Sequence, residues 1–539
     1  MNDEFENDFS TDGIEFDETV PGGSAYENLI PIEEDVISDE ISVPRTTNVG
    51  IIAELEAETA KENNFANGHT RNPRSPNVVD DEISNESEST IVNSDLNFVC
   101  DTNEYPPPRD DARYYSELRR NRDQFFILSD AGKPIYSRHG NEEDNAELNC
   151  LMQALISFVE SDDSSSYSSN NADNLLYVNT GTCKICFLHR PPLILVALSK
   201  DPAVLNFRLK QQLTLIYNQI VSLLTASRLT KIFEEHKNFD LRRLLTNTNR
   251  IFDSLIRSTE SDAACMFNAV RCLDMAGSLR DIVNQTLTNS IGKTNAIVFA
   301  IILSNSQLVA ISRMKKYTLH PLDLGLLINL VATNSSYKNC ELWIPICLPR
   351  LDSSGFLYAH ISKVSEMCDA CMILLTVDRN SFFILSQVRT TFVEKLLKSK
   401  TLQSFIEACN VRKNVRLSET QITDTWHFLY KNRSSSQIVC PEFEQPYNNE
   451  KATKRLMNLY FALHNFMHSY YDRSTNILKI YFVNGDKENL LGWITGNFEL
   501  YAVFNPLVSK TVAIGSVERL MRWLKKEEDR LFILNPVLL

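Results

Sequence analysis

The chain of 539 residues contains no long apolar run. Its two most hydrophobic segments, AIVFAIIL at 296–303 and PPLILVALS at 191–199, are far shorter than the ~20 residues that a membrane-spanning helix needs. They are typical of buried strands instead. The first residues, MNDEFENDFSTDG, have neither the basic start nor the apolar stretch of a secretory signal peptide. These absences argue against a secreted or membrane-spanning protein.

Motifs of covalent chemistry are missing as well. The sequence contains no H-E-x-x-H and no G-x-S-x-G. Gly292, Lys293 and Thr294 resemble the end of a phosphate-binding loop, but position 287 is Leu where that motif needs Gly, and a strand is expected to follow. We therefore expect an ordinary turn at this point and a protein that is not an enzyme.

Two C-x-x-C pairs, Cys183 with Cys186 and Cys368 with Cys371, have the residue types for one shared zinc ion. The first pair falls inside an expected strand, where an odd separation directs the two side chains to opposite faces. Twelve cysteines in a chain without a secretory signal are typical of reduced, buried thiols in the cytosol. We expect buried thiols at these positions, and no metal and no cofactor.

Basic residues are scarce at the start of the chain. Residues 1–110 contain 27 Asp and Glu but only 5 Lys and Arg, so this segment has a charge of −22 and the rest of the chain a charge of +7. Such a polar segment cannot bury enough apolar surface to offset the entropy lost on ordering. Residues 1–115 are therefore predicted to form a disordered acidic tail.

The remainder is predicted to repeat one order of elements. From Gln124, two strands, FFILSD and PIYSR, precede an amphipathic helix in which Leu151, Leu155 and Val159 are expected on the buried stripe. Three strand-like runs follow, and a long helix starts near Pro202. The unit is ββαβββα.

The same order returns twice, from Ala296 and, less clearly, from Trp426. A fixed order of elements without a fixed sequence period indicates repeated domains. Each unit would be a five-stranded sheet covered by helices, an α/β (α+β) class whose topology resembles the longin fold. The predicted organisation is a tail at 1–115, a first longin domain at 120–260, a helical linker at 261–294, a second longin domain at 295–410 and a third at 420–539.

Short basic runs are candidates for contact with an anionic membrane, where each basic residue near the surface contributes ~1 kcal/mol. They comprise Arg242, Arg243, Arg313, Lys315 and Lys316. A solvated face is the alternative for each. Nucleic acid is not an expected partner, because the overall charge of −15 opposes it.

Trp343 is a candidate docking residue for a partner protein that recruits this chain. It lies in ELWIPICLP, and Pro345 confines the expected strand to a sheet edge or a bulge. An edge strand with an aromatic residue can dock a partner. The alternative is a Trp packed against the neighbouring helix.

Seven segments, in this order along the chain, resemble the Mon/SAND family of vacuolar fusion proteins. They are DQFFILSDAGKPIYSRHG, NFDLRRLL, RMKKYTLHPLDL, ELWIPICLPRLDSSGFLYAHIS, FLYKNRSSSQIVCPEFEQPY, LLGWITGNFELYAVFNPLVSK and WLKKEEDRLFILN. They extend from Gln124 to Asn535, so the resemblance covers the expected folded part and leaves out the acidic tail.

The resemblance implies a three-longin subunit that pairs with a Ccz-family longin subunit. The pair would be a guanine-nucleotide exchange factor for the late-endosomal Rab GTPase (Rab seven), recruited from the cytosol by the early-endosomal Rab (Rab five) and a phosphoinositide membrane. It would serve endosome maturation, lysosome or vacuole fusion and autophagy, with a further scaffold subunit in animals. The alternative is a longin-based scaffold or adaptor that binds a GTPase without exchanging its nucleotide.

Overall fold

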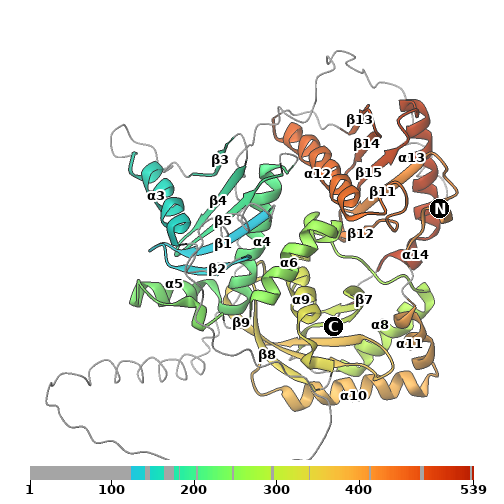
Figure 1. The fold of residues 1–539 in the computed structure, drawn as a ribbon. Coiled ribbons are helices and arrows are strands. Elements are labelled where there is room, and N and C mark those ends of the chain that lie inside the picture. Colours follow the sequence, from blue (N-terminus) through green and yellow to red (C-terminus); the bar gives the residue numbers. More distant parts are fainter. Residues whose placement is uncertain are drawn as a thin grey trace, which may run out of the picture. The chain divides into compact units, whose positions relative to one another are not determined.

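The structure is a computed structural model. It describes residues 123–139, 146–162, 175–180, 183–201, 204–245, 248–292, 297–338, 340–411, 414–473, 479–534 and 537–538. The predicted acidic tail lies outside these described residues. Figure 1 shows three sheets with their helices, coloured along the chain from blue to red.

The first sheet is antiparallel, with the strand order β2-β1-β5-β4-β3. Successive residues of β1 point to opposite faces, as the strand period requires. Phe125 belongs to the core under α4, whereas Phe126 belongs to the core under α3. The elements are β1 (Asp123–Ser129), β2 (Pro134–Ser137), α3 (Ala146–Asp162), β3 (Tyr177–Asn179), β4 (Lys184–Arg190), β5 (Leu193–Ser199) and α4 (Asn206–Leu224).

Helix α3 packs on this sheet through a different stripe from the one expected. Met152 and Ile156 are buried against the sheet, and Leu155 and Val159 are half-buried. Leu151 is 56% exposed, so the expectation that it lies on the buried stripe is wrong. The reason is that apolar residues occupy more than half of the circumference of α3, so their spacing alone did not determine which edge of that band faces the sheet.

Several helices connect the first sheet to the second. They are α5 (Ala226–Glu235), η3 (Leu241–Arg243), α6 (Asn249–Ser261), α7 (Ala263–Met266) and α8 (Gly277–Ile291). Phe252 and Ile256 of α6 complete the first core, with Phe252 in edge contact with Tyr136. Val283 and Leu287 of α8 belong to the core of the second sheet. The predicted helical linker therefore contributes packing surface to the second domain.

The second sheet has the order β16-β7-β6-β10-β9-β8. Helix α9 covers one face, while α8 and α10 cover the other. Five strands follow the predicted antiparallel scheme, and β16 is an additional sixth strand that pairs in parallel with β7. The elements are β6 (Ile297–Ser304), β7 (Gln307–Arg313), α9 (Pro321–Thr333), η4 (Ser335–Lys338), β8 (Leu342–Leu348), β9 (Asp352–Lys363), β10 (Ala370–Thr376), α10 (Phe382–Lys398), α11 (Leu402–Asn410) and β16 (Val537–Leu538).

The third sheet repeats the antiparallel order as β12-β11-β15-β14-β13. Helix α12 packs on one face and α13 on the other. The elements are η5 (Leu417–Thr420), β11 (Thr425–Asn432), β12 (Gln437–Val439), α12 (Glu450–Arg473), β13 (Ile480–Val483), β14 (Asn489–Ile494), β15 (Phe498–Phe504), α13 (Lys510–Lys526) and α14 (Glu528–Leu531). The predicted fold class of three helix-covered sheets is confirmed.

Buried polar contacts join segments that are far apart in the sequence. The Arg280 guanidinium donates to the carbonyl oxygens of Leu273 and Phe532, each at 2.5 Å. The Gln437 side chain both donates to and accepts from the Ile533 backbone, each at 2.8 Å. Since buried polar groups need partners, these contacts fix the segment that runs from α14 towards β16.

Candidate interaction surface

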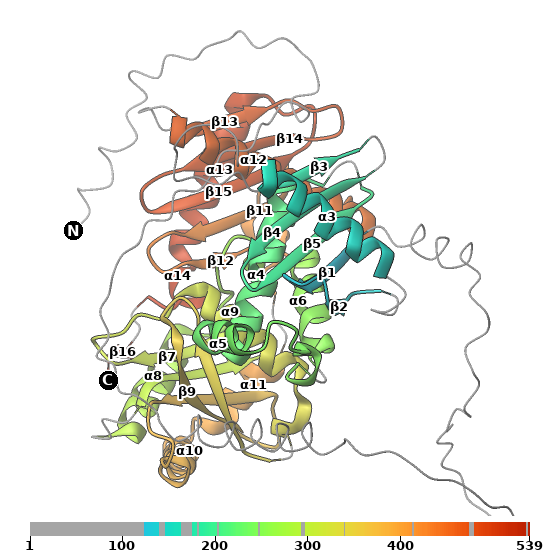
Figure 2. The ribbon, with the colours of Figure 1, turned by 90° about the vertical axis from the view of Figure 1, so that its left-hand side faces the viewer.

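The outer side of α3 carries a row of exposed apolar residues. Leu151, Ala154 and Phe158 are separated by three and four residues, so they lie on one face of the helix. Leu151 is 56% exposed and Phe158 is 72% exposed. Figure 2 shows α3 on the side of the first sheet opposite to α4. A contiguous apolar row on a helix that is already anchored by its other face is typical of a protein interface.

Trp343 lies on β8, which is the edge strand of the second sheet, as its sequence context predicted. The indole is half-buried. It stacks on Tyr358 with 5.6 Å between ring centroids and meets the ring of Phe382, on α10, edge-on at 5.9 Å. Helix α4 also contacts β8. Trp343 therefore has packing partners of its own, and the surface that it offers to another protein is the remaining exposed part of the ring.

Arg242 and Arg243 lie in the η3 turn of the first domain. Arg242 forms a two-pronged ion pair with Asp240, with both N–O distances at 3.0 Å. The hydrogen bond from Arg242 lowers the pKa of Asp240, so the carboxylate stays ionised and balances this cation. Arg243 is exposed. Both arginines remain candidates for contact with an anionic surface.

Arg313, Lys315 and Lys316 lie at the end of β7 in the second domain. Arg313 is half-buried and donates to the Tyr317 carbonyl oxygen at 2.7 Å. Both lysines are exposed, and the Lys316 ammonium is 5.6 Å from the centroid of the Tyr317 ring. The structure thus places the basic candidates on two separate domains, with an exposed cation in each.

The cysteines of the two C-x-x-C pairs lie in different domains. Cys186 on β4 and Cys371 on β10 are buried, and burial raises the pKa of each thiol to about 12. Cys183 precedes β4 and is only half-buried, so the expectation of a buried thiol inside a strand is wrong at this position. Its sulfur contacts the Thr180 hydroxyl at 3.2 Å. Cys368 is buried, and a hydrogen bond from Cys409 lowers the pKa of its thiol. Within the described part of the chain, these four cysteines do not gather into a group of three or more possible metal ligands.

One polar cluster has no counterpart among the sequence predictions. His464 and His468 of α12 face Glu499 of β15, and the three side chains have ligand atoms within 4.8 Å of one another. The signal available in the sequence was the four-residue spacing of the histidines on an expected helix. Glu499 had no signal, because only the register of the sheet brings it to this helix.

Comparison with family models identifies the class of the protein. The chain matches the models described as the first, second and third longin domains of FUZ, MON1 and HPS1 over residues 123–255, 295–394 and 424–528, respectively. It is therefore a protein of three longin domains, as its topology indicates.

Curated relatives define the family more narrowly. Vacuolar fusion protein MON1 homolog A of Bos taurus is 40% identical over 437 residues, which are 80% of this chain and 76% of that protein. Protein SAND of Takifugu rubripes is 39% identical over 78% of this chain and 77% of its own length. MON1 homolog B of Mus musculus is 34% identical, with corresponding shares of 78% and 76%. The chain belongs to the MON1/SAND family, which confirms the resemblance seen in its sequence.

Among the helices in the described part of the chain, none is both long enough and apolar enough to cross a bilayer.

Proposed function

We propose that this chain is one subunit of a heterodimeric guanine-nucleotide exchange factor that activates the late-endosomal Rab GTPase (Rab seven). Membership of the MON1/SAND family, whose members are named vacuolar fusion proteins, supports a role in vacuole or lysosome fusion and vesicle trafficking. The exposed apolar face of α3 is the observation that carries the finer proposal. Through this face, the first longin domain can bind a second longin subunit. We expect that subunit to belong to the Ccz family.

The size of this face is consistent with a contribution to a stable pair. Full burial of a Leu or Phe side chain contributes about 1.5–3 kcal/mol. Given the area that Leu151 and Phe158 still expose, covering both would contribute roughly 2–4 kcal/mol to association. Polar contacts around the row would add specificity. Neighbouring Ala154 has no bulk that would keep a partner helix at a distance.

Nucleotide exchange needs no covalent chemistry from such a pair. An exchange factor accelerates release by binding the nucleotide-free GTPase more tightly than the loaded form. A surface that bound both forms equally would shift nothing, however tightly it bound. In this proposal, two longin subunits joined through α3 provide one platform that distorts the switch region of the GTPase and weakens its contacts with Mg²⁺ and phosphate.

Recruitment to membranes is proposed to use other parts of the chain. The exposed part of Trp343 is the candidate contact for the early-endosomal Rab. The candidates for contact with a phosphoinositide surface are Arg242, Arg243, Arg313, Lys315 and Lys316. The chain would thus move between the cytosol and the membranes of endosomes, late endosomes and lysosomes, and in animals a scaffold subunit would join the complex. Autophagy is a process that this activity would serve.

The test is the release of a fluorescent guanine nucleotide from the late-endosomal Rab. Release is measured with this chain, with the Ccz-family subunit, and with both together. We expect fast release only when both subunits are present. One subunit provides only part of the binding surface, so it should bind the nucleotide-loaded and the nucleotide-free GTPase with similar affinity. Full activity of this chain alone would contradict the shared platform. Binding of the GTPase by the pair without any faster release would instead support the adaptor alternative.

Variants of α3 connect the activity to the proposed surface. Leu151→Asp places a charge in the apolar row and should reduce both pair formation, measured by size-exclusion chromatography, and exchange. Phe383→Ser is a matched control, since Phe383 is 81% exposed on α10 of the second domain. Loss of pairing in both variants, or in neither, would refute a specific role for α3.

A further inference from the structure

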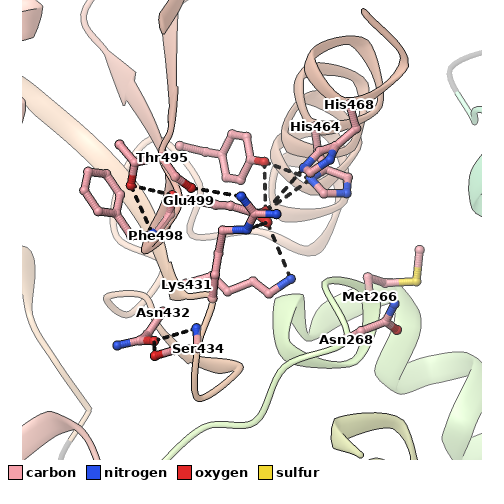
Figure 3. Close-up of polar contacts among 12 residues, drawn as sticks. Met266, Asn268, Lys431, Asn432, Ser434, His464, His468, Thr495, Phe498 and Glu499 are labelled. Carbon is pink, nitrogen blue, oxygen red and sulfur yellow. Dashed lines mark hydrogen bonds and ion pairs between the residues drawn. The ribbon is translucent and has the colours of Figure 1, made fainter. Parts of the chain in front are cut away.

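The third longin domain contains a cluster of two histidines and one glutamate between helix and sheet. His464 and His468 are four residues apart on α12, so both project from the same side of the helix. Glu499 lies on β15 two residues before Tyr501, whose ring is in the core beneath α12. Because alternate strand residues share a face, Glu499 also points towards α12. Figure 3 shows both imidazoles directed at the Glu499 carboxylate.

We propose that His464, His468 and Glu499 form a binding site for a divalent transition-metal ion, with zinc as the best match. Zinc accepts imidazole and carboxylate ligands and often has three protein ligands with water in the fourth position. Two histidines one turn apart on a helix, completed by a carboxylate from another element, provide such a set.

The distances fit a tetrahedral ion. His464 Nδ1 and His468 Nε2 each lie 3.6 Å from the same oxygen of Glu499, Oε2. Ligand atoms at about 2.0–2.1 Å from zinc, at tetrahedral angles, are about 3.4 Å apart. The two pairs are thus within a few tenths of an ångström of the required separation. The two imidazole rings lie close together, with 4.1 Å between their centroids.

The imidazole nitrogens that face Glu499 are available as metal ligands. His468 Nε2 is buried and forms no hydrogen bond in the part of the chain that the structure describes. His464 Nδ1 contacts the Tyr501 hydroxyl at 2.8 Å, and that hydroxyl would turn fully to Glu499 when the nitrogen binds metal.

Two cations next to Glu499 have to be accounted for. Lys431 Nζ and Arg433 Nε are 3.8 and 3.5 Å from Oε1, the oxygen that does not face the imidazoles. They already neutralise the carboxylate, so charge balance does not explain why two imidazoles converge on Oε2. They also hold the carboxylate in orientation, as outer groups do at metal sites. Their charge repels a divalent ion, so binding should be weaker than at purely structural zinc sites.

Binding is tested on the full-length chain after treatment with a chelator. Titration with Co²⁺, a spectroscopic substitute for Zn²⁺, should produce the visible absorption of a tetrahedral site with one equivalent bound. Competition with Zn²⁺ gives its affinity, and the melting temperature should rise with Zn²⁺ because the ion binds only the folded site. A near-ultraviolet sulfur-to-cobalt band would instead indicate binding by some of the twelve cysteines.

Variants assign the ion to these residues. His468→Gln and Glu499→Gln should weaken binding at least tenfold, whereas His236→Gln, at an exposed histidine of the first domain, should leave it unchanged. Lys431→Met should tighten binding severalfold, because it removes a repelling charge. If His468→Gln fails to fold, X-ray absorption of the wild-type cobalt complex still decides, since it distinguishes imidazole and oxygen ligands from sulfur. Absence of a cobalt site in the folded wild type, or equal binding by the ligand variants, would overturn the proposal and leave the cluster as an ion-pair network.

Discussion

Arg280 offers a sharp test of how the C-terminal segment is held. Its side chain is 3% exposed, and its guanidinium donates to the carbonyl oxygens of Leu273, Phe532 and Arg530, the last at 3.0 Å. Burial lowers the pKa of Arg280, which shows that desolvation of the cation offsets part of these bonds. Arg280→Met keeps the aliphatic volume and removes the donors.

The free energy that Arg280→Met should remove can be estimated from these contacts. Hydrogen bonds to a charged group contribute about 1.5–3 kcal/mol each, but Met also removes the cost of burying the cation. A net loss of about 1 kcal/mol per carbonyl gives roughly 3 kcal/mol in total. If this free energy is lost from the local opening equilibrium of the C-terminal segment, the segment opens more often. Its backbone amides should then exchange roughly 100-fold faster.

Hydrogen exchange measured by mass spectrometry on peptides covering 528–534 is the suitable assay, because several domains make a single unfolding free energy poorly defined. Arg522→Met, at an exposed position of α13, is the control and should not change exchange in these peptides. Unchanged exchange in Arg280→Met would refute the argument that this guanidinium fixes the segment. Faster exchange throughout the chain would mean that its role is global.

Three further predictions concern the core, the edge strand and the tail. Met152→Ala should destabilise the first domain by about 2–5 kcal/mol, whereas Leu151→Ala should change its stability by less than about 0.5 kcal/mol; hydrogen exchange in peptides from β1 and β5 of the two variants checks the orientation of α3. Trp343→Ala should weaken binding to the membrane-bound early-endosomal Rab in a liposome pull-down while exchange in solution is retained, and loss of folding would favour a purely packing role. Removal of residues 1–110 should raise exchange on anionic liposomes severalfold at low salt, because a segment of charge −22 can cover basic surfaces and screening weakens this effect. Equal rates with and without the segment would rule out this restraint.

The order of elements was predictable because each has a strong local signal. Runs such as LILVALS in β5 and the helical spacing of Leu209, Leu213 and Ile216 in α4 identify strands and helices from neighbouring residues alone. The edge position of Trp343 followed in the same way from Pro345, since a proline cannot donate to a neighbouring strand.

Features that depend on distant segments were not predictable. β16 is too short to have a strand signal, and it exists because β7 offers it unpaired backbone groups. The apolar band of α3 could face the sheet through more than one edge, so Leu151 was misplaced. Glu499 meets His464 only through the packing of α12 on β15, and a lone glutamate in a strand carries no sign of such a neighbour.

The pairing of β16 with β7 also has a consequence for synthesis of the chain. The ribosome completes β7 about 220 residues before it reaches Val537, which at 5–20 residues per second corresponds to about 10–45 s. The start of β7 is already paired with residues 271–273, but during this interval its end, at Ser312 and Arg313, lacks the strand that later pairs with it. Such an edge is a template for pairing with other nascent chains. Protection of this edge by a chaperone would therefore be useful until the C-terminal segment is complete.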